Sequence, residues 1–351
     1  MESRYILITG GAGFVGTNVA RSYLEQDQPV HILDNLSRPG VERNISELQE
    51  GYPGRVLFTQ ADVREQSTVK QAVRSARLIY HFAAQVAVTT SLADPAADAA
   101  TNLGGTLNIL EAVRALSPQT PVLFTSTNKV YGGLRNVPLC ERGARYQPLN
   151  AAISETGVNE QQALDFLSPY GCSKGSADQY VLDYAHSFGL STVVFRMSCI
   201  YGPYQLGSED QGWVAHFLRR AAKGESITLY GDGRQVRDLL FVSDLVRAMR
   251  LAMESIQKIS GHAFNIGGGA SNSASLLEVL SQIKILLGSS PRVEWGPERL
   301  GDQRWYVSDI AKISRAVKWI PQITVSQGLS QLLDWYSKRP EMVEQSRMQV
   351  A

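Results

Sequence analysis

The sequence predicts an α/β fold: a doubly wound parallel sheet with helices on both faces, joined to a smaller C-terminal α/β lobe. Two observations support this prediction. Short apolar runs alternate with stretches of helical spacing from Tyr5 to Phe195. Glycines follow the first apolar run at once, as in a tight turn that leads from a buried strand into a helix. This alternation is typical of parallel strands joined by crossover helices.

The composition is that of an ordinary globular protein. The chain has 351 residues, 44% of them hydrophobic and 19% charged, a length that suits two domains or one enlarged one. The net charge of +1 gives no global field that would favour nucleic acid or an anionic membrane. The three cysteines lie far apart, and no pair of the five histidines has ligand spacing, so we expect neither disulfides nor a metal site. With no signal-peptide pattern and no long apolar run, we expect a cytoplasmic protein.

The elements of the sheet domain follow in order along the chain. Strands are expected where short apolar runs end in glycine or polar residues, and helices where apolar residues recur at helical spacing. Pro169 fits the first turn of the last of these helices. The strands are predicted at 5–9, 30–34, 56–60, 78–82, 122–126 and 192–195, and the helices at 14–26, 95–116 and 169–188.

The pattern changes after Tyr201-Gly202-Pro203, where the lobe is expected to begin. Ser275 and Glu278 fit a capping box that opens a helix, and Ser243 is expected to cap another. Glycines and prolines gather at three places that are expected to be crossings between sheet and lobe, namely 202–212, 231–233 and 267–269. The predicted helices here are 213–223, 243–255, 275–287 and 326–336, and the predicted strands are 227–230 and 264–266.

A dinucleotide site is predicted at the first turn, Gly10-Gly11-Ala12-Gly13-Phe14-Val15-Gly16. Gly11, Gly13 and Gly16 satisfy G-x-G-x-x-G between a strand and a helix, which permits close approach of a pyrophosphate to backbone amides. Asp34 ends the second strand, where a carboxylate accepts hydrogen bonds from the adenosine ribose and repels a 2′-phosphate. The fold is therefore expected to be a Rossmann fold that binds NAD rather than NADP, with Arg38 as the one argument for NADP.

Two further strand ends are candidates for the same ligand. Asp62 follows the third strand and could hydrogen-bond adenine, although an Asp there could equally cap a helix. Phe82-Ala83-Ala84-Gln85 offers small residues after the fourth strand, where the cofactor backbone must pass. His81 beside it is expected to be a core histidine.

Tyr170 and Lys174 are the candidate acid/base pair. Four residues apart on one helix, they project from the same face. A lysine ammonium favours the phenolate and lowers the pKa of a tyrosine, so the pair could move a proton to and from an alcohol. A helix with one aromatic residue and one solvated lysine is the alternative. Thr127, at the end of the fifth strand, would complete a Thr/Tyr/Lys set.

With these motifs, the chain from Gly10 to about Trp319 resembles the extended short-chain dehydrogenase/reductase family of nucleotide-sugar epimerases and dehydratases. The resemblance implies that Tyr170 is the acid/base and that Thr127 hydrogen-bonds the reacting sugar hydroxyl. It also implies that Lys174 binds the nicotinamide ribose and lowers the pKa of Tyr170. The residues that it implies for NAD binding are Gly10, Gly11, Gly13, Phe14, Val15, Gly16, Asp34, Asn35, Arg38, Asp62, Val63, Ala83, Ala84, Gln85, Asn102, Tyr170 and Lys174.

The neighbours of Thr127 discriminate within the family. The 4,6-dehydratases resemble one another in an Asp-Glu pair at this point, whereas this chain has Asn128 and Lys129. Neither residue can act as a carboxylate base, so loss of water is disfavoured. An epimerase needs only reversible alcohol oxidation with no net redox change, so a retained NAD suffices.

Longer strings resemble the CDP-sugar 2-epimerases, which invert C2 of a CDP-linked dideoxyhexose through a 2-keto intermediate. They are Gln85–Ser91, Thr127–Lys129, Ser168–Gly175, Asp210–Trp213, Gly233–Asp238 and Asp302–Arg304. Only this resemblance favours C2 over C4. A nucleotide-sugar 4-epimerase and a catalytically silent NAD-binding relative are the alternatives.

The expected substrate contacts lie mostly in the C-terminal lobe. Arg237 and Arg299 match positions that clamp a diphosphate in the family, and arginine suits bidentate phosphate recognition. Cys199 stands where many relatives have Asn, and it is expected to be a small buried residue. The substrate-binding residues implied by the resemblance are Val86, Thr127, Asn128, Lys129, Ser198, Gln211, Trp213, Arg237, Arg299 and Arg304.

Three expectations concern the organisation of the whole chain. An NAD-binding domain is expected at 1–196, with 236–268 returning to it, a substrate lobe at 197–235 and 269–340, and a loose tail at 341–351. The long connection 133–168 could be a lid over the substrate or a surface excursion without a role. Relatives pair two long helices between subunits, so helices 95–116 and 170–188 imply a homodimer or homotetramer.

Overall fold

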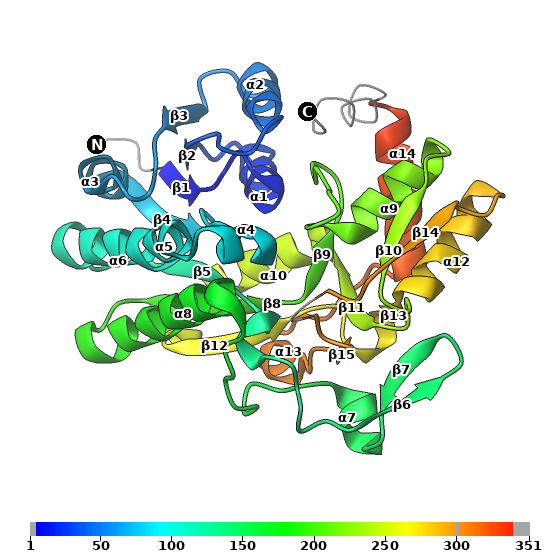
Figure 1. Cartoon of the computed structure of the whole chain (residues 1–351). Coiled ribbons are helices and arrows are strands. Elements are labelled where there is room, and N and C mark those ends of the chain that lie inside the picture. Colours follow the sequence, from blue (N-terminus) through cyan, green and yellow to red (C-terminus); the bar gives the residue numbers. More distant parts are fainter. Residues whose placement is uncertain (1–4, 300–301, 340–351) are drawn as a thin grey trace.

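The computed structural model describes residues 5–299 and 302–339, and its centre is a seven-stranded, fully parallel sheet (Figure 1). The predicted doubly wound architecture is confirmed. The first strand has the fourth on one side and the second on the other, so the strand order reverses there. In order across the sheet the strands are β12 (His262–Ile266), β8 (Thr192–Met197), β5 (Val122–Thr127), β4 (Ala76–His81), β1 (Tyr5–Thr9), β2 (Val30–Asp34) and β3 (Val56–Gln60).

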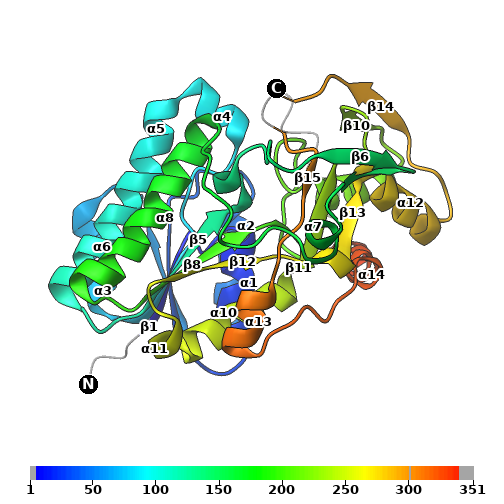
Figure 2. The same ribbon diagram turned by 90° about the horizontal axis from the view of Figure 1, so that it is seen from below.

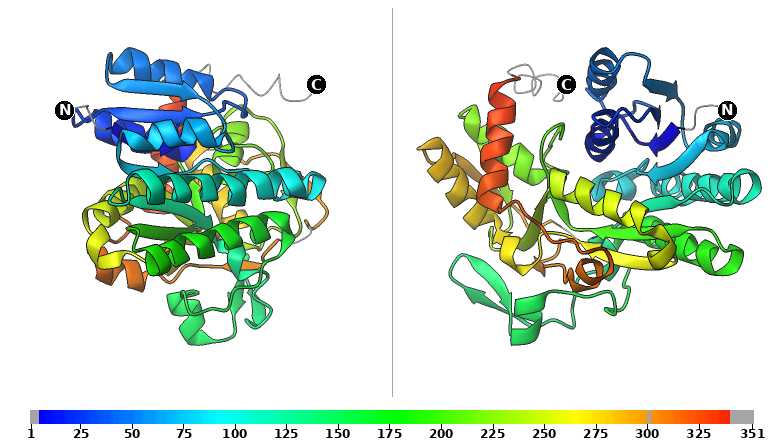
Figure 3. Two further views of the ribbon diagram at one scale, coloured as in Figure 1. Left: turned by 90° about the vertical axis from the view of Figure 1, so that its left-hand side faces the viewer. Right: turned by 180° about the vertical axis from the view of Figure 1, so that it is seen from behind.

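Helices cover both faces of this sheet (Figures 2 and 3). Successive residues of a strand point to opposite faces, so Ile6 and Ile8 belong to one core and Leu7 to the other. The helices on the Ile6 side are α1 (Phe14–Leu24), α2 (Glu42–Gly51), α10 (Val242–Glu254), α11 (Ile256–Ile259) and α13 (Ala311–Val317). Those on the Leu7 side are α3 (Gln66–Arg74), α6 (Gly105–Leu116) and α8 (Ser168–Phe188).

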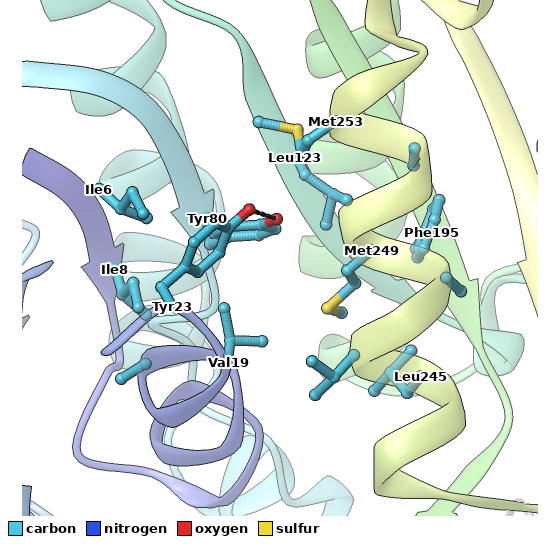
Figure 4. Close-up of a cluster of buried hydrophobic side chains, with 14 of the residues drawn as sticks. Ile6, Ile8, Val19, Tyr23, Tyr80, Leu123, Phe195, Leu245, Met249 and Met253 are labelled. Carbon is cyan, nitrogen blue, oxygen red and sulfur yellow. Dashed lines mark hydrogen bonds between the residues drawn. The ribbon is translucent and has the colours of Figure 1, made fainter. Parts of the chain in front are cut away.

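The core on the Ile6 side is shown in Figure 4, where β1, β4, β5 and β8 face α1 and α10. Two tyrosines lie inside it, and their hydroxyls satisfy one another: Tyr23 Oη and Tyr80 Oη are 2.7 Å apart. Burial raises the pKa of both phenols, which therefore stay protonated. A buried polar group without such a partner would cost free energy, so the pair allows two phenols in an apolar layer.

The long helix predicted at 95–116 is one continuous helical rod with an irregular turn. It consists of α5 (Pro95–Ala99), a π-helical turn at Ala100–Gly104 and α6, and the short α4 (Val88–Ala93) precedes it. Asp94 caps α5 by accepting a hydrogen bond from the amide of Ala97 at 2.9 Å. Such π-turns are frequent at functional sites, and this one contains Asn102.

The C-terminal lobe is built around a second, smaller sheet. In it β11 (Val236–Phe241) pairs with β9 (Cys199–Tyr201), β13 (Ser273–Ser275) and β15 (Trp305–Tyr306), so the beginning of the segment 236–268 lies in the lobe sheet. The remainder, α10 and β12, packs with the large sheet. The other lobe elements are α9 (Trp213–Ala222), β10 (Ile227–Tyr230), the 3₁₀ turn Ala270–Asn272, α12 (Leu276–Leu287), β14 (Val293–Gly296) and α14 (Val325–Ser337). The domain boundaries and the tail at 341–351 stay predictions, and the tail lies outside the described residues.

The connection 133–168 has more structure than its composition indicates. After a 3₁₀ turn at Asn128–Tyr131 it forms the hairpin β6 (Leu139–Arg142) and β7 (Arg145–Pro148), and then α7 (Ala151–Thr156). It is fastened to the lobe by an ion pair between Arg145 and Glu278 and by a bridge between Val158 and Ser308. Its strands are only four residues long, which explains why no periodicity indicates them.

Helix caps were predicted with mixed success. The capping box of Ser275 and Glu278 is confirmed, and a second one, Thr324 with Gln327, opens α14. The cap assigned to Ser243 is wrong: α10 begins at Val242 because β11 runs directly into it through Phe241. No helix among residues 5–299 and 302–339 combines the length and apolarity needed to cross a membrane.

Candidate active site

A cavity of about 630 Å³ opens at the carboxyl ends of the parallel strands, which is where open α/β sheets bind ligands. It reaches from the glycine turn after β1 to the loop around Gln211 in the lobe. Most of the sequence-predicted site residues line it. These are Gly10, Gly13, Phe14, Val15, Gly16, Asp34, Asn35, Arg38, Asp62, Val63, Ala83, Ala84, Gln85, Val86, Thr127, Tyr170, Lys174, Ser198 and Gln211.

The backbone of the glycine turn leaves no room for side chains at Gly10 and Gly16. Gly10 has φ +68°, and a Cβ there would lie 2.6 Å from the amide nitrogen of Ala83. A Cβ on Gly16 would lie 2.4 Å from the carbonyl oxygen of Gly10, so this glycine permits close packing of α1 on the turn. A Cβ on Gly13 would meet only the Gly10 carbonyl, at 3.2 Å, and Gly13 lines the cavity. The N-terminus of α1 is therefore open to an anionic group.

These two glycines allow a matched prediction. We expect Gly16→Ala to lower the free energy of unfolding by about 1–3 kcal/mol, since its Cβ would collide with backbone. Gly13→Ala should change that free energy by less than about 0.5 kcal/mol, yet purify with less bound NAD because its methyl group points to the cavity. Denaturant unfolding and NAD released per chain measure the two effects. A Gly13→Ala protein with a full complement of NAD would contradict a pyrophosphate position at this turn.

Asp34 lies at the end of β2 and lines the same cavity. Its carboxylate accepts hydrogen bonds from the backbone amides of Ala12 and Leu36, at 3.0 and 2.9 Å. Burial raises the pKa of Asp34, although both amide bonds oppose that shift. The carboxylate is thus fixed beside the glycine turn, as a ribose-binding acid would be. The cavity, the open helix end and this carboxylate together fit NAD.

Arg38 and Asp62 have protein partners that restrict their roles. Arg38 reaches across to the lobe, where its guanidinium donates to the side chain of Gln211 at 2.6 Å and to the carbonyl of Leu206. These two hydrogen bonds therefore join the two sides of the cavity. Asp62 pairs with Arg64 and accepts a hydrogen bond from Asn35, interactions that lower its pKa to about 2. Asp62 stays ionised and able to accept further hydrogen bonds.

Two residues expected to contact the cofactor do not line the cavity. Gly11 lies behind the turn, where a Cβ would come within 2.7 Å of Ile32. Asn102, in the π-turn, instead fixes the backbone of Gln85: the Gln85 amide donates to its Oδ1 at 2.9 Å, and its Nδ2 donates to the Gln85 carbonyl at 3.1 Å. Asn102 therefore supports the backbone of Gln85, which lines the cavity, and does not line the cavity itself. His81 is a core histidine as expected, with Thr9 and Thr106 on its two ring nitrogens.

The Thr/Tyr/Lys set comes together on the cavity wall. Thr127 ends β5, Tyr170 and Lys174 lie one turn apart on α8, and all three side chains line the cavity. In contrast to the expected lowering by Lys174, the pKa of Tyr170 is raised to about 12. Burial is the main cause and the charge of Asp98 contributes, while the neighbouring Thr127 hydroxyl opposes the shift. Desolvation penalises the phenolate more than these neighbours stabilise it.

Lys174 is almost completely buried, at 3% exposure, and does not have the solvated position of the alternative interpretation. Its ammonium lies 4.1 Å from the ring centroid of Phe124. Burial lowers its pKa to about 7, and the charges of Asp178 and Asp98 act in the opposite direction. A lysine with such a pKa is poised to exchange a proton near neutral pH.

The residues after Thr127 connect the large sheet to the lobe and do not line the cavity. Asn128 donates to Gln303 at 3.0 Å, and Lys129 lies 3.5 Å from Asp302. Asp302 also pairs with Arg237 at 2.6 Å. Burial lowers the pKa of Lys129 to about 8. The two positions at which the resemblance implies carboxylates in dehydratases thus hold an amide and a cation in this chain.

The remaining lobe residues lie outside the cavity lining. Arg299 pairs with Asp210 at 3.3 Å and stacks on Tyr230, and the exposed Arg304 lies 3.5 Å from Glu298. Trp213 packs against Phe217 at the start of α9 and belongs to the lobe core, not to the cavity lining. Cys199 does line the cavity, and burial raises the pKa of its thiol to about 12, which makes it a poor nucleophile.

The structure adds residues that sequence reasoning missed. Asp98, Thr125, Ser126 and Met197 line the cavity, and Ser173 lies beneath it between Tyr170 and Lys174 on α8. The only sequence signal for Asp98 is its spacing of four from Asn102, which is common in helices. No residue of 133–168 lines the cavity, so the lining gives no support to a lid formed by that segment.

Comparison with known proteins provides independent findings. A family described as "NAD dependent epimerase/dehydratase family" matches residues 6–267. The chain is 41% identical over 339 residues to the CDP-paratose 2-epimerase of Salmonella typhi, a match that covers 95% of this chain and 99% of that protein.

Two solved structures are similar over nearly the whole chain. One is the UDP-glucose 4-epimerase of Thermotoga maritima with UDP-glucose, with a TM-score of 0.81 and 30% identity, covering 95% of this chain and 99% of the other. The second is a dTDP-glucose 4,6-dehydratase from Bacillus anthracis in complex with NAD, with a TM-score of 0.80 and 29% identity, covering 97% and 98% of the two chains.

Proposed function

This chain belongs to the NAD dependent epimerase/dehydratase family, and from that premise we propose that it inverts C2 of a CDP-linked sugar, as in the conversion of CDP-paratose to CDP-tyvelose. It is an enzyme whose cofactor is NAD, as in the NAD complex of its structural relative. The observation that carries the proposal is the Thr127–Tyr170–Lys174 set on a cavity that fits NAD, with Asn128 and Lys129 in place of dehydratase carboxylates.

Bound NAD supplies the hydride acceptor, and the chain supplies the proton relay. Thr127 orients the reacting hydroxyl, and the Tyr170 phenolate takes its proton as the alcohol becomes a ketone. Because burial disfavours that phenolate, we assign to the Lys174 ammonium, one helical turn away, the role of offsetting part of this cost. After the keto sugar has presented its other face, Tyr170 would return the proton to the carbonyl oxygen. Such a positioned acid/base typically contributes about 10²–10⁴-fold to the rate.

The diphosphate of the substrate would be bound from the lobe side. Arg237 and Arg299 are the proposed ligands, and each now pairs with a carboxylate, Asp302 and Asp210 respectively. A diphosphate would compete with these carboxylates for bidentate hydrogen bonds. The choice of cytidine over uridine and of C2 over C4 rests on similarity to the Salmonella typhi protein.

The decisive experiment is incubation of CDP-paratose with the enzyme in deuterated water, followed by NMR of the product. We expect inversion at C2 without deuterium at that carbon, because the hydride returns internally. Deuterium at C2 would point instead to enolisation. Inversion at C4 of CDP-glucose or UDP-glucose, with C2 untouched, would replace this proposal by the 4-epimerase function of the Thermotoga maritima relative.

We also propose that the protein is a homodimer or a larger homo-oligomer. The helical rod from α5 to α6 and the helix α8 lie side by side on one face of the molecule (Figures 1 and 2). Tyr180 and Phe188 on α8 are 44% and 49% exposed, which is unusual for large aromatic side chains. Burial of this face against a second copy would remove their apolar surface from water.

A further inference from the structure

A buried carboxylate lies beneath the proposed acid/base pair. Asp98, on α5, is 1% exposed, and its oxygens accept three hydrogen bonds from neutral groups. Gln85 Nε2 and Asn102 Nδ2 donate to Oδ1 at 2.8 and 3.1 Å, and the hydroxyl of Ser173 donates to Oδ2. The carboxylate is therefore satisfied as an acceptor, but no cation neutralises it directly: among the described residues Asp98 has no ion pair within 4.0 Å.

Lys174 is the cation that the charge of Asp98 affects. Ser173, which donates to Asp98, precedes Lys174 on α8, and its hydroxyl also lies 3.3 Å from the carbonyl of Tyr170. Within the described residues Lys174 makes no ion pair within 4.0 Å either, and its ammonium rests on the ring of Phe124. Asp98 and Lys174 are thus two buried and opposite charges: Asp98 is hydrogen-bonded to the residue that precedes Lys174, and its charge favours the ammonium form. In such surroundings water screens their attraction little.

We propose that Asp98 is a positioning residue for the acid/base pair, whose buried negative charge keeps Lys174 an ammonium ion and whose hydrogen bonds fix the first turns of α8 against α5. The inference rests on the proposed function for its catalytic consequence only. The effect of the Asp98 charge on Lys174 does not depend on the proposed reaction.

Three other side chains act on Lys174 or contact it. Asp178, on α8 itself, favours the ammonium more than Asp98 does, and it also forms a bidentate pair with Arg196 of β8. His81, on β4, is held neutral, because burial and the charge of Lys174 lower its pKa to about 3. Phe124 on β5 contributes only its ring face. Asp98 is thus the carboxylate without a cationic partner of its own.

The direction in which the pKa of Lys174 should change follows from the charge of Asp98. Burial lowers the pKa of Lys174 to about 7, and Asp98 raises it. Removal of the Asp98 charge should therefore lower the pKa of Lys174 further, so that the ammonium is lost at lower pH. Since the Tyr170 phenolate needs that ammonium, the alkaline limb of the activity profile should move to lower pH as well.

Two substitutions separate charge from geometry. Asp98→Asn is nearly isosteric, and its amide can keep all three hydrogen bonds: the oxygen accepts from Gln85 and Asn102, and the NH₂ group donates to Ser173. It removes only the charge. Ser173→Ala does the opposite, since it deletes the hydroxyl that contacts Asp98, Asn102 and the carbonyl of Tyr170, and leaves the carboxylate in place.

The experiment is an NMR titration of ¹³Cε-labelled lysine in the NAD-containing protein, with Lys174→Met to assign the signal. We expect Asp98→Asn to lower the pKa of Lys174 by about one unit, and Ser173→Ala to change it by less than about 0.3 unit. The alkaline limb of kcat should move with the titration. Asp98→Ser is a second neutral variant for use if Asp98→Asn does not fold.

The outcomes are distinguishable. An unchanged Lys174 pKa in the neutral variants, or an equal shift in Ser173→Ala, would overturn the inference and make Asp98 a structural residue. Lack of turnover by the unmodified enzyme with every CDP- and UDP-sugar tested would overturn the proposed function instead. The titration would still decide the role of Asp98, because it needs no substrate.

Discussion

Tyr170→Phe should abolish epimerisation, with kcat reduced about 10³-fold or more, while the protein still folds and retains NAD. The substitution removes one oxygen and keeps the ring that packs on the cavity wall. Without the phenol the proposed relay loses the group that takes the alcohol proton, and a positioned acid/base is worth about 10²–10⁴-fold. The rate is measured by NMR of the CDP-sugar product, and NAD is measured after its release from the purified protein.

A matched control is Tyr52→Phe, which also removes one phenolic oxygen but lies at the end of α2, outside the cavity lining. It should retain the activity of the unmodified enzyme within about twofold. Epimerisation at an unchanged rate in Tyr170→Phe would remove Tyr170 from the mechanism. A parallel loss of NAD would show that the phenol acts in cofactor retention instead.

Asp178→Ala should have the largest effect on stability, lowering the free energy of unfolding by about 3–5 kcal/mol. Asp178 is completely buried and forms a bidentate pair with Arg196, at 2.8 and 2.9 Å. Arg196 also donates to the hydroxyl of Tyr131 at 3.1 Å. Removal of the carboxylate would leave a guanidinium buried without a counter-ion, which is why loss of one partner costs more than the pair contributes. Denaturant-induced unfolding followed by circular dichroism measures this change.

The control for this prediction is an ion pair of similar length on the surface. Asp334 and Lys338 lie 2.7 Å apart on α14, with side chains 61% and 71% exposed. Asp334→Ala should change the free energy of unfolding by less than about 0.5 kcal/mol, because solvent screens exposed pairs. Equal losses in the two variants would contradict the argument that burial decides the cost.

The large sheet could be predicted almost residue by residue, because its signals are local. Val30–Asp34 and Val56–Gln60 are strands with the predicted bounds, and each is a short apolar run closed by a polar residue. Val30–Asp34 is buried except at its last residue, and a buried parallel strand must be apolar on both faces, a requirement that is visible in consecutive residues. The glycine turn is equally local, since the conformation at Gly10 and the packing at Gly16 require glycine itself.

The short lobe strands could not be predicted in this way. β9, β13 and β15 have three, three and two residues, too few for any periodicity. They are strands only because β11 provides partners for their backbone groups. Their existence is a property of pairing between segments that are distant in the sequence.

For the site, the sequence by itself determined the types of residue and their order: the glycine turn, Asp34, Thr127, and the pair Tyr170 and Lys174. It could do so because each belongs to a motif in which neighbouring residues and one element suffice. Only the tertiary structure decided their electrostatic state. Burial raises the pKa of Tyr170 to about 12 and lowers that of Lys174 to about 7, and Asp98 and Ser173 meet beneath them although 75 residues separate the two along the chain. Desolvation and through-space charge depend on what the folded chain brings near, and no stretch of sequence contains that information.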